Sequence, residues 1–125
     1  MIKYITTEAA ARPLGHYSQA IVHNGTVYVA TQLGIIPGKS IVVGSIEEQT
    51  KAALNNVREI LKAAGSDLNK VLKITIYIAD INFWDEVNAV FVQFFGDHKP
   101  ARGVIPCKEL HKGFQVAIDV IAAIY

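Results

Sequence analysis

The chain has 125 residues, of which 51% are hydrophobic and 18% charged, and 12 Lys and Arg against 11 Asp and Glu give a formal net charge of +1. With a net charge this close to zero, the chain has no strong electrostatic field to attract nucleic acid or an anionic membrane surface, which argues against both as partners. The length fits one domain over residues 1–125, and the high apolar fraction predicts that some surface is buried against another copy.

The sequence indicates a soluble protein of the cytoplasm. Its single cysteine, Cys107, cannot form an internal disulfide, which fits a reducing compartment. Residues 1–4 contain no basic segment leading into an apolar run, and no later stretch approaches the roughly 18 apolar residues of a membrane span. We therefore expect a cytoplasmic location.

The first part of the chain predicts strands around a loop. A short strand is expected at residues 3–5, and a loop rich in polar and aromatic residues at 13–20. Residues 20–23 and 26–30 flank Asn24-Gly25, a dipeptide that readily takes the positive φ angles of a two-residue turn. We therefore predict a β-hairpin there.

The segment from Gly34 to Ser40 looks at first like a phosphate-binding P-loop. It has one residue too few between its glycines, and residues 41–44 follow where a helix N-terminus would have to point at the phosphate. We therefore reject a nucleotide site and predict a loop that leads to a short strand.

A helix is predicted to begin after Ser45, which forms a capping-box pattern with Glu48, and to stop at Gly65. Its apolar residues recur at helical spacing, as an amphipathic helix over a flat apolar surface requires: Ala53, Leu54, Val57, Ile60, Leu61 and Ala64. The surface is predicted to be a strand over residues 71–78, whose alternation places four apolar residues on one face: Leu72, Ile74, Ile76 and Ile78.

A second helix is predicted with Asn82 as its N-cap and Gly96 near its end. Its apolar stripe contains Phe83, Val87, Val90, Phe91 and Phe94, and Asn88 lies off this stripe. After it, residues 103–107 are expected to begin a strand, 108–113 to form a loop and 114–124 to form the last strand.

This order of strands and helices predicts an α+β fold with a single mixed sheet. Right-handed crossovers would place both helices on the same face of that sheet. The other face would carry a mixture of side chains that is too polar for a hydrophobic core and too apolar for full exposure to solvent. We therefore expect this face to contact other copies of the chain in a closed, ring-shaped oligomer. The residues of this face would be Lys73, Thr75, Tyr77, Ala117, Asp119 and Ile121.

Two charged residues near the C-terminus stand out chemically. Arg102 follows Pro100, and its planar fork of N–H donors matches a carboxylate with two parallel hydrogen bonds. Asp119 lies in an apolar strand, where an ionised carboxylate needs a partner, a bound water or a chemical role. The residues alone leave two interpretations open: charges paired with each other or with a neighbouring subunit, or a site for a small acid.

No metal site is predicted. The four histidines, His16, His23, His98 and His111, show no short ligand spacing, and no cysteine or carboxylate cluster completes a site. Cys107 and His111 have no evident third group beside them, so we interpret the cysteine as a packed or edge residue rather than a nucleophile.

Five short motifs lie along the chain: Pro13 to Ala20, the Gln32 loop, Val87-Asn88, Pro100 to Arg102 and Val116 to Ala122. In this order and at these separations, they resemble the RidA/YjgF family over essentially the whole chain. The resemblance implies a chorismate-mutase-like fold and a homotrimer with ligand clefts between subunits. It also implies hydrolysis of reactive enamine and imine acids to 2-keto acids and ammonia without metal or cofactor. The implied substrates are 2-aminoacrylate, 2-iminopropanoate and 2-iminobutanoate.

The resemblance assigns substrate-binding roles to several residues. Arg102 matches the family's carboxylate-binding arginine, Tyr17 the aromatic residue that lines the cleft, and Asn88 a helix residue near it. Thr31 stands where many members have a glycine, and it narrows the pocket or disfavours a positive φ. Val104 stands in place of a cysteine, so backbone contacts alone are expected to persist there.

Asp119 stands where active members usually have a glutamate that holds and activates the attacking water. Aspartate can accept a proton from water in the same way, but it is one methylene shorter, and a misplaced catalytic group can cost roughly a hundredfold. Arg102 and Asp119 are therefore the catalytic residues that the resemblance implies.

Three functions remain open from the sequence. The first is an imine and enamine deaminase. The second is a non-catalytic protein that binds a 2-keto acid or another small carboxylate, which the departures at Thr31 and Asp119 favour. The third is an endoribonuclease or translation inhibitor, for which the sequence shows no basic stripe with interleaved aromatic residues.

Overall fold

The computed structural model describes residues 1–39 and 44–125. Six strands form one sheet in the order β1-β2-β3-β6-β4-β5. The β4–β5 pair is parallel and the other neighbours are antiparallel, so the predicted mixed sheet is confirmed. The strands are β1 (Lys3–Ile5), β2 (Ala20–His23), β3 (Thr26–Leu33), β4 (Val71–Ile78), β5 (Ala101–Pro106) and β6 (Val116–Ala123).

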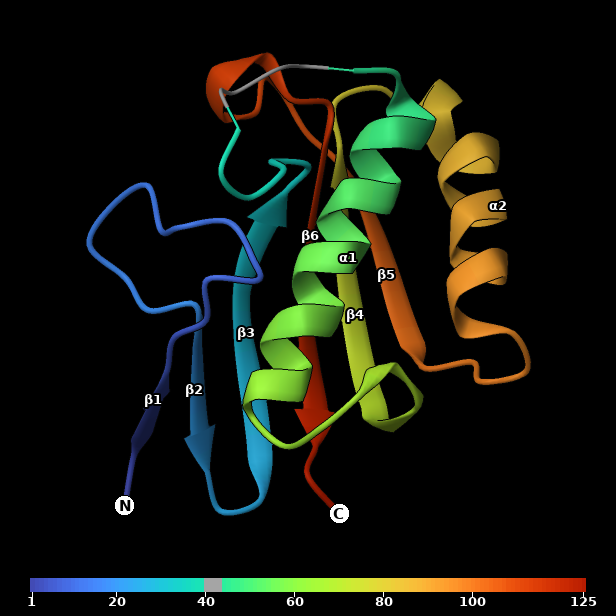
Figure 1. Ribbon diagram of the computed structural model, residues 1–125. Helices are drawn as coiled ribbons and strands as arrows, with labels where there is room; N and C mark the ends of the chain where they lie inside the picture. Colours follow the sequence, from blue (N-terminus) through green and yellow to red (C-terminus); the bar gives the residue numbers. More distant parts are fainter. Residues whose placement is uncertain (40–43) are drawn as a thin grey trace.

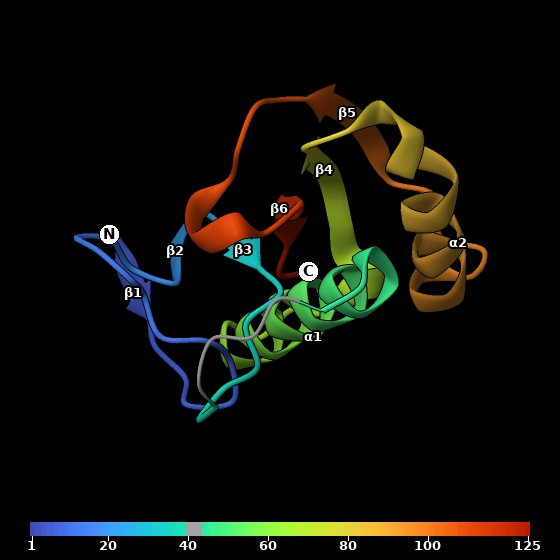
Figure 2. The same cartoon turned by 90° about the horizontal axis from the view of Figure 1, so that it is seen from above.

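Two helices, α1 (Ile46–Ala63) and α2 (Trp84–Phe95), cover the same face of this sheet (Figure 1). The view from above shows both on one side (Figure 2). The connections β3-α1-β4 and β4-α2-β5 both advance in the same direction along the sheet, so right-handed crossovers place their helices together. We call the covered side the helix face and the other side the open face. Within the described ranges, no helix is long and apolar enough to cross a membrane.

The hydrophobic core fills the space between the helix face and the two helices. Alternate residues of the central strands point into it, as the period of a half-buried strand requires. The buried residues of this core include Val27 and Val29 of β3, Ile74, Ile76 and Ile78 of β4, Val116, Ile118 and Val120 of β6, Leu54, Val57, Ile60 and Leu61 of α1, and Val87, Val90 and Phe91 of α2.

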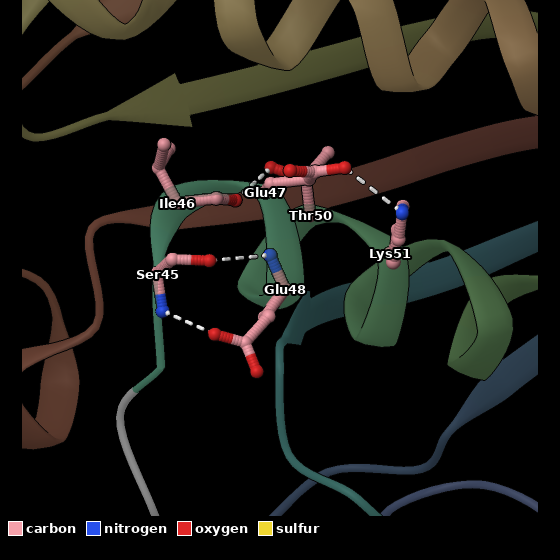
Figure 3. Close-up of polar contacts among 6 residues, drawn as sticks. All are labelled: Ser45, Ile46, Glu47, Glu48, Thr50 and Lys51. Carbon is pink, nitrogen blue, oxygen red and sulfur yellow. Dashed lines mark hydrogen bonds and ion pairs between the residues drawn. The ribbon is translucent and has the colours of Figure 1, made fainter.

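The predicted ends of α1 are confirmed, and Figure 3 shows the cap at its N-terminus. The Ser45 hydroxyl accepts a hydrogen bond from the Glu48 backbone N–H, and Glu48 Oε1 accepts one from the Ser45 backbone N–H, both at 3.1 Å. The bond from the Ser45 backbone lowers the pKa of Glu48 below its usual value. Gly65, with φ of +84°, follows the helix, so capping box and glycine act as expected.

The predicted hairpin is also confirmed. β2 and β3 pair in antiparallel fashion across Asn24 and Gly25, whose φ angles are 50° and 76°. A primed turn needs positive φ at both central positions. The short strand predicted near residues 41–43 lies outside the described residues.

Two details of the predicted elements are wrong. Leu72 was expected in the core, but the register of β4 shifts between Val71 and Lys73, so Val71 is buried and Leu72 is 53% exposed. The second helix does not begin at an Asn82 cap. Asp80 caps a short turn, Ile81–Phe83, by accepting from the Asn82 N–H at 2.9 Å, and α2 then starts at Trp84 without a side-chain cap.

Several predicted boundaries move by a few residues. β5 starts at Ala101 rather than 103, and the last strand spans Val116–Ala123 rather than 114–124. The loop at 108–113 ends in a helical turn, His111–Gly113. Gln32, expected in a loop, is a buried residue of β3.

Candidate functional site

Arg102 lies on the edge strand β5 and points to the helix face. It pairs with Ile74 of β4, whose side chain is in the core, and laterally paired residues share a face. Its Nη1 donates a hydrogen bond to Asn88 Oδ1 of α2 at 2.8 Å. Its Cζ lies 5.4 Å from the ring centroid of Trp84 and 5.6 Å from that of Phe91. These contacts orient the guanidinium plane while the residue as a whole stays exposed.

A groove of about 400 Å³ opens beside Arg102, between α2 and the start of β5. His98 and Asn88 line it together with Lys99 and Arg102, and the positive charges of Lys99 and Arg102 favour an anionic ligand. His98 Nε2 lies 2.8 Å from the carbonyl oxygen of Val71, and because a carbonyl only accepts, this nitrogen carries a hydrogen.

Val104 follows Arg102 on the same side of β5. It pairs with the core residue Ile76 and packs against the edge of the core. Its side chain lies with Trp84, Asn88 and Arg102 around one small pocket. Of the predicted site residues, the structure therefore brings Arg102, Asn88 and Val104 together on the helix face.

Asp119 lies on β6 and points to the open face. It pairs with Thr75 of β4, is half-buried, and accepts a hydrogen bond through Oδ2 from Thr31 Oγ1 at 3.1 Å. The β3–β6 register shifts between Val29 and Gln32, so that Ala30 and Thr31 both stand opposite Asp119 in a β-bulge. Thr31 is not among the described non-glycine residues with positive φ, so its side chain causes no backbone strain.

A cleft of about 630 Å³ adjoins Thr31 on the open face. Its lining is mostly apolar and includes Tyr17, and it consists of Leu14, Gly15, Tyr17, Ala30, Thr31, Leu33, Leu110, His111 and Ala117. The Tyr17 hydroxyl accepts a hydrogen bond from the Leu14 N–H at 3.0 Å, which holds the ring against its own loop. Tyr17, Thr31 and Asp119 therefore form a second group, on the open face.

Two buried amides that sequence reasoning gave no role hold the loop carrying Tyr17. Gln19 Oε1 accepts from the Thr7 N–H at 2.7 Å, and its Nε2 donates to the carbonyls of Thr7 and Ala11. Asn56 of α1 accepts from the Ala11 N–H at 3.2 Å and donates to the Ile35 carbonyl at 2.8 Å. The sequence signal that could have indicated this role is the position of Asn56, an amide residue, among the apolar positions of α1.

The two groups lie on opposite faces of one sheet, with β4 between their strands. Among residues 1–39 and 44–125 the ion pairs are Lys51–Glu47 and Lys62–Glu59. The interpretation that Arg102 and Asp119 bond to each other is therefore wrong within one chain. In the same residues, no three His, Cys, Asp or Glu side chains gather closely enough to hold a metal ion.

Fold and site define a small α+β protein with an arginine groove on one face of its sheet and a carboxylate beside a cleft on the other. A model of the endoribonuclease L-PSP family matches residues 7–124. A 2-iminobutanoate/2-iminopropanoate deaminase of Bos taurus is 43% identical over 121 residues, which are 96% of this chain and 88% of the relative.

Solved structures agree with this match. RidA from the Antarctic bacterium Psychrobacter sp. superimposes with a TM-score of 0.94 at 32% identity, covering 97% of this chain and 98% of that one. E. coli TdcF with bound serine gives a TM-score of 0.92 at 29% identity, with coverage of 97% and 98%. The chain belongs to the RidA/YjgF family, and the predicted family and fold are confirmed.

Proposed function

We propose that the protein hydrolyses small reactive 2-imino acids and their enamine tautomers to 2-keto acids and ammonia. The observation that carries this proposal is the Arg102 guanidinium, whose plane is fixed by Asn88 and two aromatic rings at an exposed groove. A planar fork held in this way binds a carboxylate in one orientation. The deaminase name of the Bos taurus relative and the serine bound to TdcF support a substrate of this class.

Asp119 acts as the general base in this proposal. A water oxygen bonds to C2 of the protonated imine while the C=N π electrons move to nitrogen, and the carboxylate accepts a proton from the water. Asp119 then returns this proton to the nitrogen. The C–N bond breaks and its electron pair leaves with ammonia, while the remaining hydroxyl gives its proton to the Asp119 carboxylate and becomes the carbonyl of the 2-keto acid. Asp119 passes this proton to the departing ammonia, so the carboxylate is regenerated. The preferred substrates are 2-iminopropanoate, 2-iminobutanoate and 2-aminoacrylate.

The proposed site is shared between subunits of a homotrimer. Arg102 and Asp119 lie on opposite faces of the sheet, so one chain does not present both to one small ligand. The open face also exposes Tyr28 and Ile105, apolar side chains that a neighbouring copy would cover. In this arrangement the Arg102 groove of one copy faces the Asp119 cleft of the next.

The first test measures keto-acid release while a dehydratase generates 2-iminopropanoate or 2-iminobutanoate in the presence of semicarbazide, which competes for the imine. Wild type is expected to accelerate release. Arg102→Ala should lower kcat/KM by about 10–100-fold, because a charge-assisted hydrogen bond contributes about 1.5–3 kcal/mol. Arg58→Ala is the matched control, since Arg58 also bonds an asparagine, Asn55, and lies 4.8 Å over the ring of Phe94.

Failure of wild type to accelerate release would contradict the deaminase proposal. If calorimetry then showed Arg102-dependent binding of a 2-keto acid, the non-catalytic binding function would replace it. An Arg58→Ala variant as impaired as Arg102→Ala would show that loss of any stacked arginine is harmful and that the groove has no special role.

Mixing two impaired variants tests the shared site. Arg102→Ala should be about 10–100-fold less active than wild type and Asp119→Ala should have little activity, but unfolding and refolding them together at equal amounts should raise activity to about a quarter of that of wild type, because each site combines residues from two randomly chosen copies. Mixtures no more active than the separate variants would contradict a site between subunits. A monomer in light scattering would contradict the homotrimer.

A further inference from the structure

We infer that Thr31 is a positioning residue for Asp119: its hydroxyl, aimed by the β3 bulge, fixes the carboxylate for the attack of water. This inference rests on the proposed function, in which Asp119 accepts the proton of that water. It concerns how the chain orients the carboxylate and assigns Thr31 no contact with the substrate.

The bulge is what brings Thr31 to Asp119. Val29 pairs with Val120, so a regular strand would place Ala30 opposite Asp119 and would place Thr31 opposite Ile118, on the helix face. The extra residue instead leaves Gln32 opposite Ile118, and Thr31 points to the open face with its Oγ1 3.1 Å from Asp119 Oδ2. A bulge that re-aims one side chain in this way is a common feature next to active sites.

The direction of this hydrogen bond decides what it can do. An ionised carboxylate only accepts, so the Thr31 hydroxyl donates its single hydrogen to Oδ2. The terminal torsion of aspartate is otherwise broad and two-fold, and the bond restricts it. Among the described residues Oδ1 has no hydrogen-bond partner, so Oδ1 is the oxygen assigned to the water.

Thr75 supplies a matched comparison in the same place. It is the direct cross-strand neighbour of Asp119 on β4, it shares the open face, and like Thr31 it is a threonine in a strand. The hydrogen bond described for the Asp119 carboxylate comes from Thr31 and not from Thr75. Removing the two hydroxyls separately therefore distinguishes the positioning bond from the general polarity around the carboxylate.

The experiment compares Thr31→Val, Thr31→Ser and Thr75→Val in the keto-acid release assay. Valine keeps the branched shape and the strand preference of threonine, so it removes the donor without opening a cavity. We expect Thr31→Val to lower kcat about 10–100-fold, the range that a misplaced catalytic group can cause, and to leave KM within about twofold. Thr31→Ser should retain most of kcat, and Thr75→Val should behave like wild type.

Several results would overturn the inference while leaving the deaminase function intact. One is a normal kcat for Thr31→Val in an enzyme that Asp119→Ala inactivates. Another is a rise of KM together with the fall of kcat, which would mean that Thr31 contacts the ligand directly. Equal losses in Thr31→Val and Thr75→Val would indicate a general effect on the sheet.

A second readout does not depend on activity. The carboxyl ¹³C resonance of Asp119, assigned by its loss in Asp119→Asn, should shift in Thr31→Val and stay in place in Thr75→Val. An unmoved resonance in Thr31→Val would overturn the positioning role. If the resonance shifts but the protein has no deaminase activity, the contact between Thr31 and Asp119 is supported and the proposed function is rejected. Failure of the Thr31 inference and failure of the proposed function therefore give different results.

Discussion

Replacement of Asn56 by leucine is expected to destabilise the protein through the loop that carries Tyr17. Asn56 is 1% exposed, and its side chain joins a backbone group of the loop before β2 to two backbone groups at and just after the end of β3. It accepts from the Ala11 N–H and donates to the carbonyls of Ile35 and Leu33, at 3.2, 2.8 and 3.3 Å. Leucine has a similar shape and no polar atom, so these groups would lose their partner.

The size of the effect follows from two opposing contributions. Each buried backbone group left without a hydrogen bond costs about 1–3 kcal/mol. Burying the leucine side chain returns about 2 kcal/mol. With three such backbone groups, we expect the free energy of unfolding to fall by about 1–7 kcal/mol in total, a substantial part of the roughly 5–15 kcal/mol typical of a folded domain.

Urea unfolding followed by circular dichroism measures this difference. Variants should be compared at one protein concentration, because unfolding of an assembled protein depends on concentration. Asn55→Leu is the control, since Asn55 is the neighbouring amide but is exposed on α1, and its effect should stay within about 0.5 kcal/mol. Equal effects of the two substitutions would refute the reasoning that the buried amide stabilises the loop.

Two further predictions concern the elements that frame the site. Ser45→Ala should cost about 1 kcal/mol at neutral pH, as loss of an N-cap usually does. Because the bond from the Ser45 backbone makes the pKa of Glu48 lower in the folded chain than in the unfolded one, the contribution of Glu48 is present above its ordinary pKa and is lost as pH falls through the lowered value. The unfolding difference between wild type and Glu48→Gln should therefore shrink in acid, and a difference that grew would contradict the capping box. Val71→Ala should lower stability by about 1–2 kcal/mol and Leu72→Ala by less than about 0.5 kcal/mol in urea unfolding, whereas the reverse order would contradict the bulge in β4.

The parts of the fold that could be predicted are those with a local cause. The α1 cap needs only a serine and a glutamate three residues apart, and the β2–β3 turn needs only an asparagine and a glycine. Both signals act within a few residues of chain. The placement of the helices on one face also followed from the order of elements, because crossover handedness is general.

The parts that could not be predicted depend on pairing between distant strands. A bulge shifts the alternation of a strand by one residue, and neither the bulge at Val71–Lys73 nor the one at Val29–Gln32 has a sequence signal such as glycine. The prediction therefore placed Leu72 in the core. For the same reason it treated Thr31 as a residue that narrows a pocket and missed its bond to Asp119.

Candidate site residues could be selected from the sequence, but their geometry could not be predicted. Arg102 and Asp119 were recognisable from their chemistry, because an arginine guanidinium near a turn and a carboxylate in an apolar strand both need a partner. Their faces are set by register, which pairs Arg102 with Ile74 and Asp119 with Thr75. The sequence does not encode this register locally, so pairing between the two charges stayed open until the strands were aligned.

The exposure of the two charges gives a physical reason for a site between copies. In one chain Arg102 is exposed and Asp119 half-buried, so water screens both and neither interacts strongly with a small ligand. Contact between the helix-face groove of one copy and the open-face cleft of another would exclude that water and strengthen both interactions. Burying unpaired charges is costly, and a ligand with a carboxylate near Arg102 and a protonated imine near Asp119 compensates for both. Such a ligand would therefore stabilise the assembly by the same contacts that orient it for hydrolysis.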